Sequence, residues 1–236
     1  MEKQVSIFIV VVTSFQPLYM ECNKILRNQC DKYKIPVLFL FNGKVPDGYT
    51  LQNDERIISE AEEMNPWMFL KFKSALREIF GANLNPDYII RCNSSTFINI
   101  KKLKIVFAKL PRERCLAAPF GYVFSNVYCF GTCMIFSNDV ARHIAFDENI
   151  DDACRLQNDD IYISNITETY ASKFDINYFF NYSFSYANKI PSFYDIMVEP
   201  RHVFFRIKNE ANRLEIDFEY WKLLYHLYDD LQYYIE

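Results

Sequence analysis

The start of the chain alternates between continuous apolar runs, typical of buried strands, and apolar residues at helical spacing. A continuous β-branched and aliphatic run from Val5 to Thr13 is typical of a strand buried on both faces, as in a parallel sheet. Apolar residues then recur at helical spacing over Pro17–Tyr33, and the run Val37–Phe41 indicates a second buried strand that ends at Asn42-Gly43. A strand, a helix and a strand joined by short connections predict a βαβ unit.

Patterns of the same two kinds continue along the rest of the chain. They predict helices at 59–80, 101–108, 139–145, 158–169 and 218–234, and strands at 88–90, 115–119 and 127–136. Aromatic segments before the last helix indicate further strands. No repeat, low-complexity tract or Pro/Gly-rich linker interrupts the pattern. We therefore expect a single α/β domain over residues 1–236, with a mixed, mostly parallel sheet flanked by helices.

Polar residues follow three of the predicted strands. They are Thr13-Ser14, Asn42-Gly43 and the run from Arg91 to Ser95. Ligands of open α/β sheets bind beyond the carboxyl ends of the strands, so we expect a binding site where these residues meet. Phe15, next to Ser14, is a candidate for stacking on a ligand ring, although core packing is the simpler reading.

Charge, hydropathy and missing motifs exclude several classes of binding partner and enzyme. The formal net charge is −4 and the pI about 5.5, so the chain lacks the basic face that a nucleic-acid binder needs. The apolar run near the start is too short to span a membrane and has no cleavage-like region, which predicts a cytoplasmic protein without a membrane span. The sequence has no P-loop, GxSxG or GxGxxG motif, which argues against kinases, hydrolases and dehydrogenases.

Four segments resemble the motifs of a known family. In chain order they are Leu70-Lys71, Pro86–Asn99, Tyr128–Ala141 and Asn158–Ile163. Their order and rough spacing resemble GT-A glycosyltransferases of the β1,3-galactosyltransferase and fringe type. The resemblance covers about Val5 to Ser164, and in size and composition the chain is similar to small glycosyltransferases of large DNA viruses.

This resemblance implies a Rossmann-like GT-A domain and an enzyme that moves a sugar from a nucleotide-sugar, most simply a UDP-sugar, to a glycan acceptor. The donor would bind to the half before about residue 100, and the acceptor to the half from about 101 to 236. Asp160, with Asp159 as its substitute, matches the base of an inverting transfer. Gly131 and Thr132 match the acceptor segment. A viral chain would work in the host cytoplasm or in the virion.

The sequence departs from the family at its metal-binding motif. Asn93-Ser94-Ser95 stands where the family has Asp-Asp-Asp, and amide and hydroxyl oxygens are weak ligands for hard divalent cations. We therefore predict no metal ligand and little or no dependence on Mn²⁺ or Mg²⁺. Other cations must then neutralise the departing diphosphate. The candidates are Lys71, Arg91, His202, Arg206 and Lys208, of which the last three share one face of an extended segment.

Each candidate also has a plainer interpretation. Asn93 and Ser95 can be loop residues that satisfy local backbone groups, and Asp159 and Asp160 can be acids stabilised at a helix start. His202 can be a packed ring. Among the others, Lys71 can lie on the surface, Arg206 and Lys208 can form a solvated strand edge, and Gly131 can mark a bulge.

Three other functions stay open from the sequence. The chain can be a degenerate transferase that binds nucleotide or glycan without turnover, a retaining enzyme of the same fold, or a structural subunit that uses its aromatic surface. Nucleotide binding, the anomeric configuration of the product and the effect of Asp160→Asn distinguish them.

Overall fold

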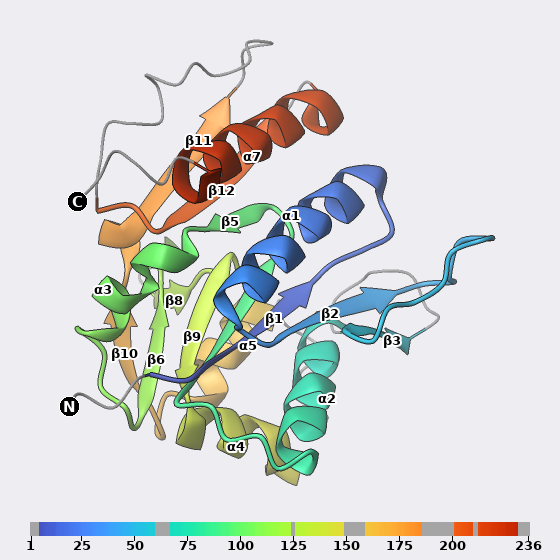
Figure 1. Cartoon of the computed structure of the whole chain (residues 1–236). Helices are drawn as coiled ribbons and strands as arrows, with labels where there is room; N and C mark the ends of the chain where they lie inside the picture. Colours follow the sequence, from blue (N-terminus) through green and yellow to red (C-terminus); the bar gives the residue numbers. More distant parts are fainter. Residues whose placement is uncertain are drawn as a thin grey trace.

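The computed structural model describes residues 5–59, 67–123, 126–148, 159–185, 201–209 and 212–230. At its centre is a seven-stranded sheet with the strand order β10-β6-β9-β4-β1-β2-β3 (Figure 1). Its strands are β1 (Ile7–Val12), β2 (Val37–Asn42), β3 (Glu55–Ser59), β4 (Tyr88–Asn93), β6 (Cys115–Ala118), β9 (Cys133–Ser137) and β10 (Ser172–Asp175). Neighbouring strands are parallel except at β9, which runs antiparallel to β4 and β6. The predicted mixed, mostly parallel sheet is confirmed.

Helices cover both faces of this sheet (Figure 1). They are α1 (Pro17–Tyr33), α2 (Trp67–Gly81), α3 (Leu103–Phe107), α4 (Asn138–Phe146), α5 (Asp159–Ile166) and α7 (Phe218–Tyr225). Residues of α1, α3 and α7 share one apolar core with the sheet, and residues of α2, α4 and α5 share the other. In the part of the chain that the structure describes, no helix is long and apolar enough to cross a membrane.

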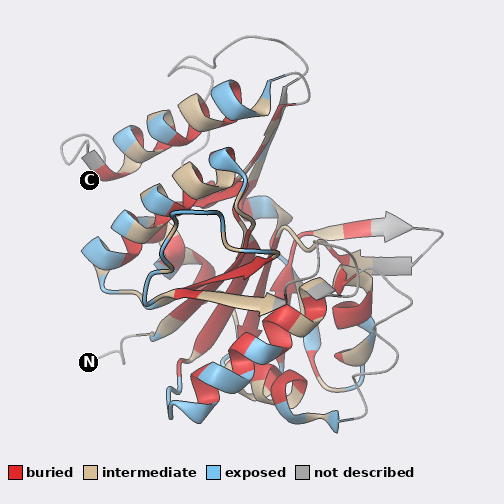
Figure 2. Ribbon diagram, turned by 90° about the vertical axis from the view of Figure 1, so that its right-hand side faces the viewer, coloured by how far each residue is buried: buried red, intermediate tan, exposed pale blue. Residues whose placement is uncertain are grey.

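The strands at the centre of the sheet are apolar on both sides because both sides are covered. In β1, Ile9 and Val11 pack into the core on the α1 side, whereas Phe8 and Val10 pack into the core on the α2 side. Figure 2 shows these buried strands between helices whose outer faces are exposed. Burying one such side chain stabilises the fold by about 1.5–3 kcal/mol, which explains why the continuous apolar run predicted a strand of this kind.

A second sheet of three strands begins directly after β4. It has the order β11-β12-β5 and consists of β5 (Thr96–Ile98), β11 (Phe180–Ser185) and β12 (Phe204–Asn209). Because β12 pairs antiparallel with β5, Arg206 lies opposite Thr96. The last third of the chain therefore contributes a side chain next to the end of β4. A separate hairpin is formed by β7 (Phe120–Val123) and β8 (Asn126–Cys129).

The end of the chain is fastened to α1. The π-helices η5 (Arg213–Asp217) and η6 (His226–Asp230) flank α7, which lies beside α1 in Figure 1. The buried carboxylate of Asp229 accepts hydrogen bonds from Gln29 Nε2 and from Tyr33 Oη, the latter at 2.7 Å. Lys32 Nζ donates to the Asp229 carbonyl at 2.8 Å. These polar contacts fix the position of the final helix on the sheet.

Two predicted elements differ in their bounds. The helix predicted at 59–80 begins too early, because Ser59 ends strand β3 and α2 begins at Trp67, with residues 60–66 outside the described residues. Strand β3 itself was missed because Glu55 and Arg56 interrupt its apolar pattern. Glu55 is buried all the same, since its carboxylate accepts a hydrogen bond from Arg27 Nη2 at 2.7 Å.

Three further elements need correction. The single strand predicted at 127–136 is two strands, β8 and β9, separated by a turn at Gly131 and Thr132. The helix predicted at 101–108 begins one residue earlier with a 3-10 turn, η1 (Ile100–Lys102), and continues as α3. Strand β4 extends through Asn93, so Arg91 belongs to a strand and not to a loop. Asn158 and the residues after 230 lie outside the described part.

Candidate functional site

The candidate site lies where the strand order of the main sheet reverses. β1 has β2 on one side and β4 on the other, and Val12 at the end of β1 pairs with Asn93 at the end of β4. Open α/β sheets bind ligands in the crevice that forms outside the carboxyl ends of strands at such a reversal. Thr13 to Phe15 follow β1 at this edge, and Ser94 and Ser95 follow β4.

Arg206 brings a cation to the turn after β4. Its Nη1 donates hydrogen bonds to Asn93 Oδ1 and to Ser95 Oγ, and the Ser95 hydroxyl donates to Asn93 Oδ1 at 3.1 Å. Burial, and next the charge of Arg213, lower the pKa of Arg206. A guanidinium nevertheless stays charged at neutral pH because its intrinsic pKa is very high. The turn that lacks carboxylates therefore holds a positive charge of its own.

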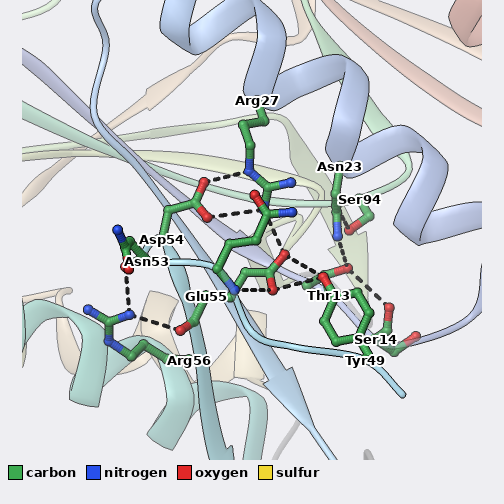
Figure 3. Close-up of polar contacts among 11 residues, drawn as sticks. Thr13, Ser14, Asn23, Arg27, Tyr49, Asn53, Asp54, Glu55, Arg56 and Ser94 are labelled. Carbon is green, nitrogen blue, oxygen red and sulfur yellow. Dashed lines mark hydrogen bonds and ion pairs between the residues drawn. The ribbon is translucent and has the colours of Figure 1, made fainter. Parts of the chain in front are cut away.

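A buried hydrogen-bond network joins the two strand ends beneath this turn (Figure 3). Asn23 of α1 donates from Nδ2 to Thr13 Oγ1 at 2.9 Å and accepts at Oδ1 from Ser94 Oγ, also at 2.9 Å. All three side chains are almost completely buried. Their polar groups are therefore occupied with one another, and the network positions the segments after β1 and β4 relative to α1.

An aromatic group lies beside the end of β1. The ring of Phe15 stacks on Phe41 with a centroid distance of 4.4 Å, and Tyr49 meets Phe15 edge-on at 5.7 Å. The Tyr49 hydroxyl donates to the buried Glu55 carboxylate, which also accepts from Arg27 (Figure 3). Burial, and next the hydrogen bond to this carboxylate, raise the pKa of Tyr49 to about 12. Phe15 is half-buried and held in place on two sides.

Polar groups without partners lie at the same edge. Both side-chain polar atoms of Asn42 and the hydroxyl of Ser14 are buried and form no hydrogen bond within the described part of the chain. Buried side-chain amides normally have partners, so such groups call for an explanation. They stand at the carboxyl ends of β1 and β2, where a ligand can supply the missing partners.

Arg91 is turned into the protein on the α2 side of β4. Its Nη2 forms a buried ion pair with Asp159 at the start of α5, and its Nη1 donates to the Gly131 carbonyl at 2.7 Å. Arg91 is 2% exposed, so its charge is used inside the protein. The structure thus joins two residues that the sequence assigned to different roles, the phosphates for Arg91 and the base for Asp159.

Asp160 lies next to this ion pair and is half-buried. Its Oδ1 accepts from the amide of Ile161 at 2.9 Å, and its Oδ2 lies 3.4 Å from the amide nitrogen of Gly131. Burial, and then the charge of Asp159, raise the pKa of Asp160 above the usual value for an aspartate. A Cβ at Gly131 would lie 3.0 Å from Arg91 Nη1 and 3.3 Å from Asp160 Cβ. A side chain at position 131 would therefore require Arg91 or Asp160 to move by a few tenths of an ångström.

The turn at Gly131 and Thr132 connects the two groups of residues. The Thr132 carbonyl oxygen lies 3.0 Å from Thr96 Oγ1 and 3.4 Å from the Asn93 amide nitrogen, while the neighbouring Gly131 carbonyl bonds to Arg91. This turn thus has Asn93 on one side and Asp160 on the other. The Asp160 carboxylate therefore lies on one side of this turn, and Asn93 with its bonded Arg206 guanidinium lies on the other.

The remaining candidates occupy different surroundings. Lys208 is half-buried on the same face of β12 as Arg206, whereas Lys71 is fully buried within α2. His202 is also buried, with its Nδ1 3.2 Å from Asn181 Nδ2. Lys208 follows Ile207, whose amide donates to the Ser95 carbonyl at 3.1 Å, whereas His202 lies beside Asn181 of β11.

Three solved structures with a similar fold are glycosyltransferases. One is involved in the glycosylation of the major capsid of PBCV-1. It has a TM-score of 0.54 and 8% identity over 92% of this chain and 99% of that chain. Another is apo GlyE of Streptococcus pneumoniae TIGR4, with a TM-score of 0.51 and 10% identity over 95% of this chain and 63% of that one.

A third is galactosyltransferase LgtC in complex with donor and acceptor sugar analogs. It has a TM-score of 0.50 and 12% identity over 94% of this chain and 96% of that chain. The chain has a GT-A fold. No protein-family model matches the sequence, and no curated protein has a matching sequence. The GT-A expectation is confirmed for the fold, and the finer resemblance to the fringe type stays a prediction.

The metal position of the GT-A fold has an unsuitable donor set in this chain. Asn93 Oδ1 and Ser95 Oγ already accept from a guanidinium, and the Ser94 hydroxyl is buried against Asn23. Among the residues described, no group of three or more His, Cys, Asp or Glu side chains is arranged to hold a metal ion. Neutral oxygens bonded to a cation do not fit a divalent metal.

Sequence reasoning missed three residues of this region. Thr96 and Asn23 support the turn after β4, and Arg213 donates from Nη1 to Tyr19 Oη at 2.9 Å in the first turn of α1. A signal for Asn23 was present, because it is a polar residue on the helix surface that also carries Cys22 and Leu26. Nothing in the local sequence around Arg213 indicates its proximity to α1.

A large open hollow of about 1350 Å³ lies at the opposite, amino-terminal edge of β1 and β4. Its lining is mainly apolar, with a few lysines and one arginine, and includes Val5, Tyr33, Lys34, Lys101 and Arg112. None of its described lining residues is an aspartate, glutamate, histidine or cysteine. Its described lining therefore offers no carboxylate or imidazole, and the candidate site stays at the carboxyl edge.

Proposed function

We propose that this chain is a glycosyltransferase that moves a sugar from a UDP-sugar to a glycan acceptor. In this proposal the whole chain is one GT-A domain, with the donor half before about residue 100 and the acceptor half after it. The observation that carries the proposal is the Arg206 guanidinium, which is anchored by Asn93 and Ser95 at the point where the sheet reverses. A cation fixed at this point suits the diphosphate of a nucleotide-sugar.

Asp160 is the general base of the proposed reaction. Its carboxylate takes the proton of an acceptor hydroxyl while the hydroxyl oxygen attacks the anomeric carbon of the donor. The bond between that carbon and the phosphate oxygen breaks, and UDP leaves with the bonding electron pair. Attack from the opposite side inverts the anomeric configuration. The half-buried position of Asp160 beside Gly131 supports this role, because Asp159 is occupied by Arg91.

Arg206 stabilises the charge that develops on the leaving diphosphate, and Lys208 on the same strand face assists it. No step in this mechanism passes through a metal ion, since the turn after β4 does not suit one. Arg91 acts through Asp159 and the Gly131 carbonyl and thereby positions Asp160. The polar groups of Ser14 and Asn42, which lack hydrogen-bond partners among the described residues, support nucleoside binding at the end of β1, and so does the ring of Phe15.

A panel of nucleotide-sugars tests the proposal. We expect UDP-sugars to raise the unfolding temperature of the purified chain, since a ligand that binds the folded state stabilises it. One of them should be turned over to UDP. Asp160→Asn should abolish turnover and keep UDP binding, while Asp31→Asn, an exposed aspartate of α1, should leave both unchanged. Failure of every nucleotide-sugar to bind would refute the proposal, and a product of retained configuration would refute its stereochemistry.

A degenerate transferase is the second candidate, favoured by the absence of carboxylates in Asn93-Ser94-Ser95. Such a protein would bind UDP and release it unchanged, and Asp160→Asn would have no effect on any measured property of the site. Isothermal calorimetry combined with a turnover assay separates the two. For location, we propose the cytoplasm, and fractionation of cells that produce the protein tests this.

A further inference from the structure

We propose that Arg213 is a second diphosphate-binding residue. Together with Arg206 it forms a two-arginine site that selects nucleoside diphosphate donors over nucleoside monophosphate donors. The inference rests on the proposed function, because it concerns the donor site of that reaction. It goes further by adding a residue that discriminates between diphosphate and monophosphate donors.

The first argument is the position of Arg213. It opens η5, which is anchored to the end of β12 by a 2.7 Å hydrogen bond from the Asn209 amide to Asp217 Oδ1. Its Nη1 donates to the hydroxyl of Tyr19, in the first turn of α1. One turn further along α1, Asn23 reaches Thr13 and the turn after β4. Arg213 therefore lies at the carboxyl edge of the sheet, beside the candidate site.

The second argument is an unused donor. Arg213 Nε donates to Asp217 Oδ2 at 2.9 Å and Nη1 donates to Tyr19, but Nη2 is buried and has no hydrogen-bond partner among the residues that the structure describes. A buried charged donor without a partner is costly, and such groups usually have an acceptor in the functional state. An anion at this edge of the sheet would supply that acceptor.

The third argument is the balance of charge. Arg206 makes its hydrogen bonds with neutral oxygens, and in the described residues no carboxylate forms an ion pair with it. Arg213 has one carboxylate partner among the same described residues, Asp217. The two guanidinium groups thus share a single carboxylate as ion-pair partner in this part of the structure. Burial, and next the charge of Arg213, lower the pKa of Arg206. Like charges brought together in a partly buried place are stabilised when an anion with more than one charge binds between them.

This arrangement discriminates between classes of donor. The diphosphate of a nucleoside diphosphate sugar carries two negative charges and can contact both arginines. The single phosphate of a nucleoside monophosphate sugar carries one negative charge and can neutralise only one of them. A solely structural Arg213 would fasten η5 through Asp217 and would not distinguish the two.

Calorimetric titration of UDP and UMP tests the inference, with GDP and GMP as a second pair for another base. We expect the wild type to bind the diphosphate more tightly than the monophosphate. Arg213→Gln should lower that preference by roughly tenfold or more, since a charge-assisted hydrogen bond is lost. Arg206→Gln should lower it as well. Arg142→Gln is the matched control, because Arg142 bonds Asn138 and Asn85 away from this edge.

The outcomes are distinguishable. An unchanged preference in Arg213→Gln, or an equal loss of affinity for UDP and UMP, would overturn the role of Arg213 and leave the proposed function intact if Arg206→Gln still loses the preference. If the wild type binds neither UDP nor GDP, the proposed function itself fails. Should Arg213→Gln not fold, Arg213→Lys keeps a positive charge opposite Asp217 and is expected to lose part of the preference, whereas full retention contradicts the proposal.

Discussion

Arg91 of β4 and Asp159 at the start of α5 form an ion pair whose side chains are only 3% and 7% exposed. The pair connects the central sheet to the helix that carries Asp160. Because Arg91 also donates to the Gly131 carbonyl, it fixes the helix start and the neighbouring turn at once. Its contribution is to geometry and is separate from any contact with the substrate.

Removal of one partner of this pair should destabilise the fold. We expect Asp159→Asn to lower the free energy of unfolding by about 3–5 kcal/mol, because it leaves an uncompensated buried guanidinium. Glu78→Gln is the control, since its pair with Arg56 is 38% and 44% exposed and should contribute less than about 1 kcal/mol. Urea denaturation measures both, and equal losses in the two variants would contradict the prediction.

The rate of transfer should fall at acid pH through a group with a raised pKa. A base must be deprotonated to work, and burial together with Asp159 raises the pKa of Asp160. The acid limb of kcat/KM should therefore lie above the pKa of about 3.9 of a free aspartate. In Asp159→Asn the limb should move to lower pH, since a neighbouring negative charge is removed. A limb that stays in place would argue against Asp160 as the base.

Gly131→Ala should impair turnover more than it impairs UDP binding. The new Cβ would lie 3.0 Å from Arg91 Nη1 and 3.3 Å from Asp160 Cβ, so one or both side chains must move by a few tenths of an ångström. Small displacements of catalytic groups can lower rates by about a hundredfold. Gly81→Ala is the comparison, because a Cβ there meets no atom within 4 Å. Steady-state kinetics decide the matter, and equal kcat values for the two variants would refute it.

Transfer should persist after chelation of divalent metals and should depend on Arg206. We expect full activity in EDTA, because the oxygens of Asn93 and Ser95 are bonded to Arg206 and unsuited to a metal. Arg206→Gln should lower kcat by about 10²–10³, the usual effect of removing one strong donor from developing charge. Complete loss of activity on chelation, restored by Mn²⁺, would show that the turn recruits a metal after all.

The sequence predicts the central strands well and the site only in part. Apolar runs such as Val5–Thr13 identify buried strands because burial on two faces leaves no room for polar residues. The polar run from Arg91 to Ser95 lies at the carboxyl end of β4, as its position after an apolar run predicted, and its role in binding stays a prediction. Strand β3 was not predicted because the charged Glu55 interrupts its apolar pattern. The charge of Glu55 is compensated by Arg27 of α1, and a local sequence pattern does not reveal this contact.

The partners of each site residue are decided by contacts between distant parts of the chain. Arg206 reaches Asn93 because β12 pairs with β5, and Asp159 reaches Arg91 because α5 packs on the same side of the sheet. Alternation along a strand predicts which residues share a face, but it does not say what covers that face. The sequence could therefore list Arg91 and Arg206 as cations and could not tell which one is neutralised internally.

The pairing of β12 with β5 also affects when the proposed donor site can exist. Asn93 leaves the ribosome early, whereas Arg206 and Arg213 follow more than a hundred residues later, and the Asp229 contact that secures this region comes later still. A nascent chain can thus assemble much of its sheet before it can hold a phosphate. In the proposed function, donor binding would therefore become possible only after β12 and η5 have been synthesised.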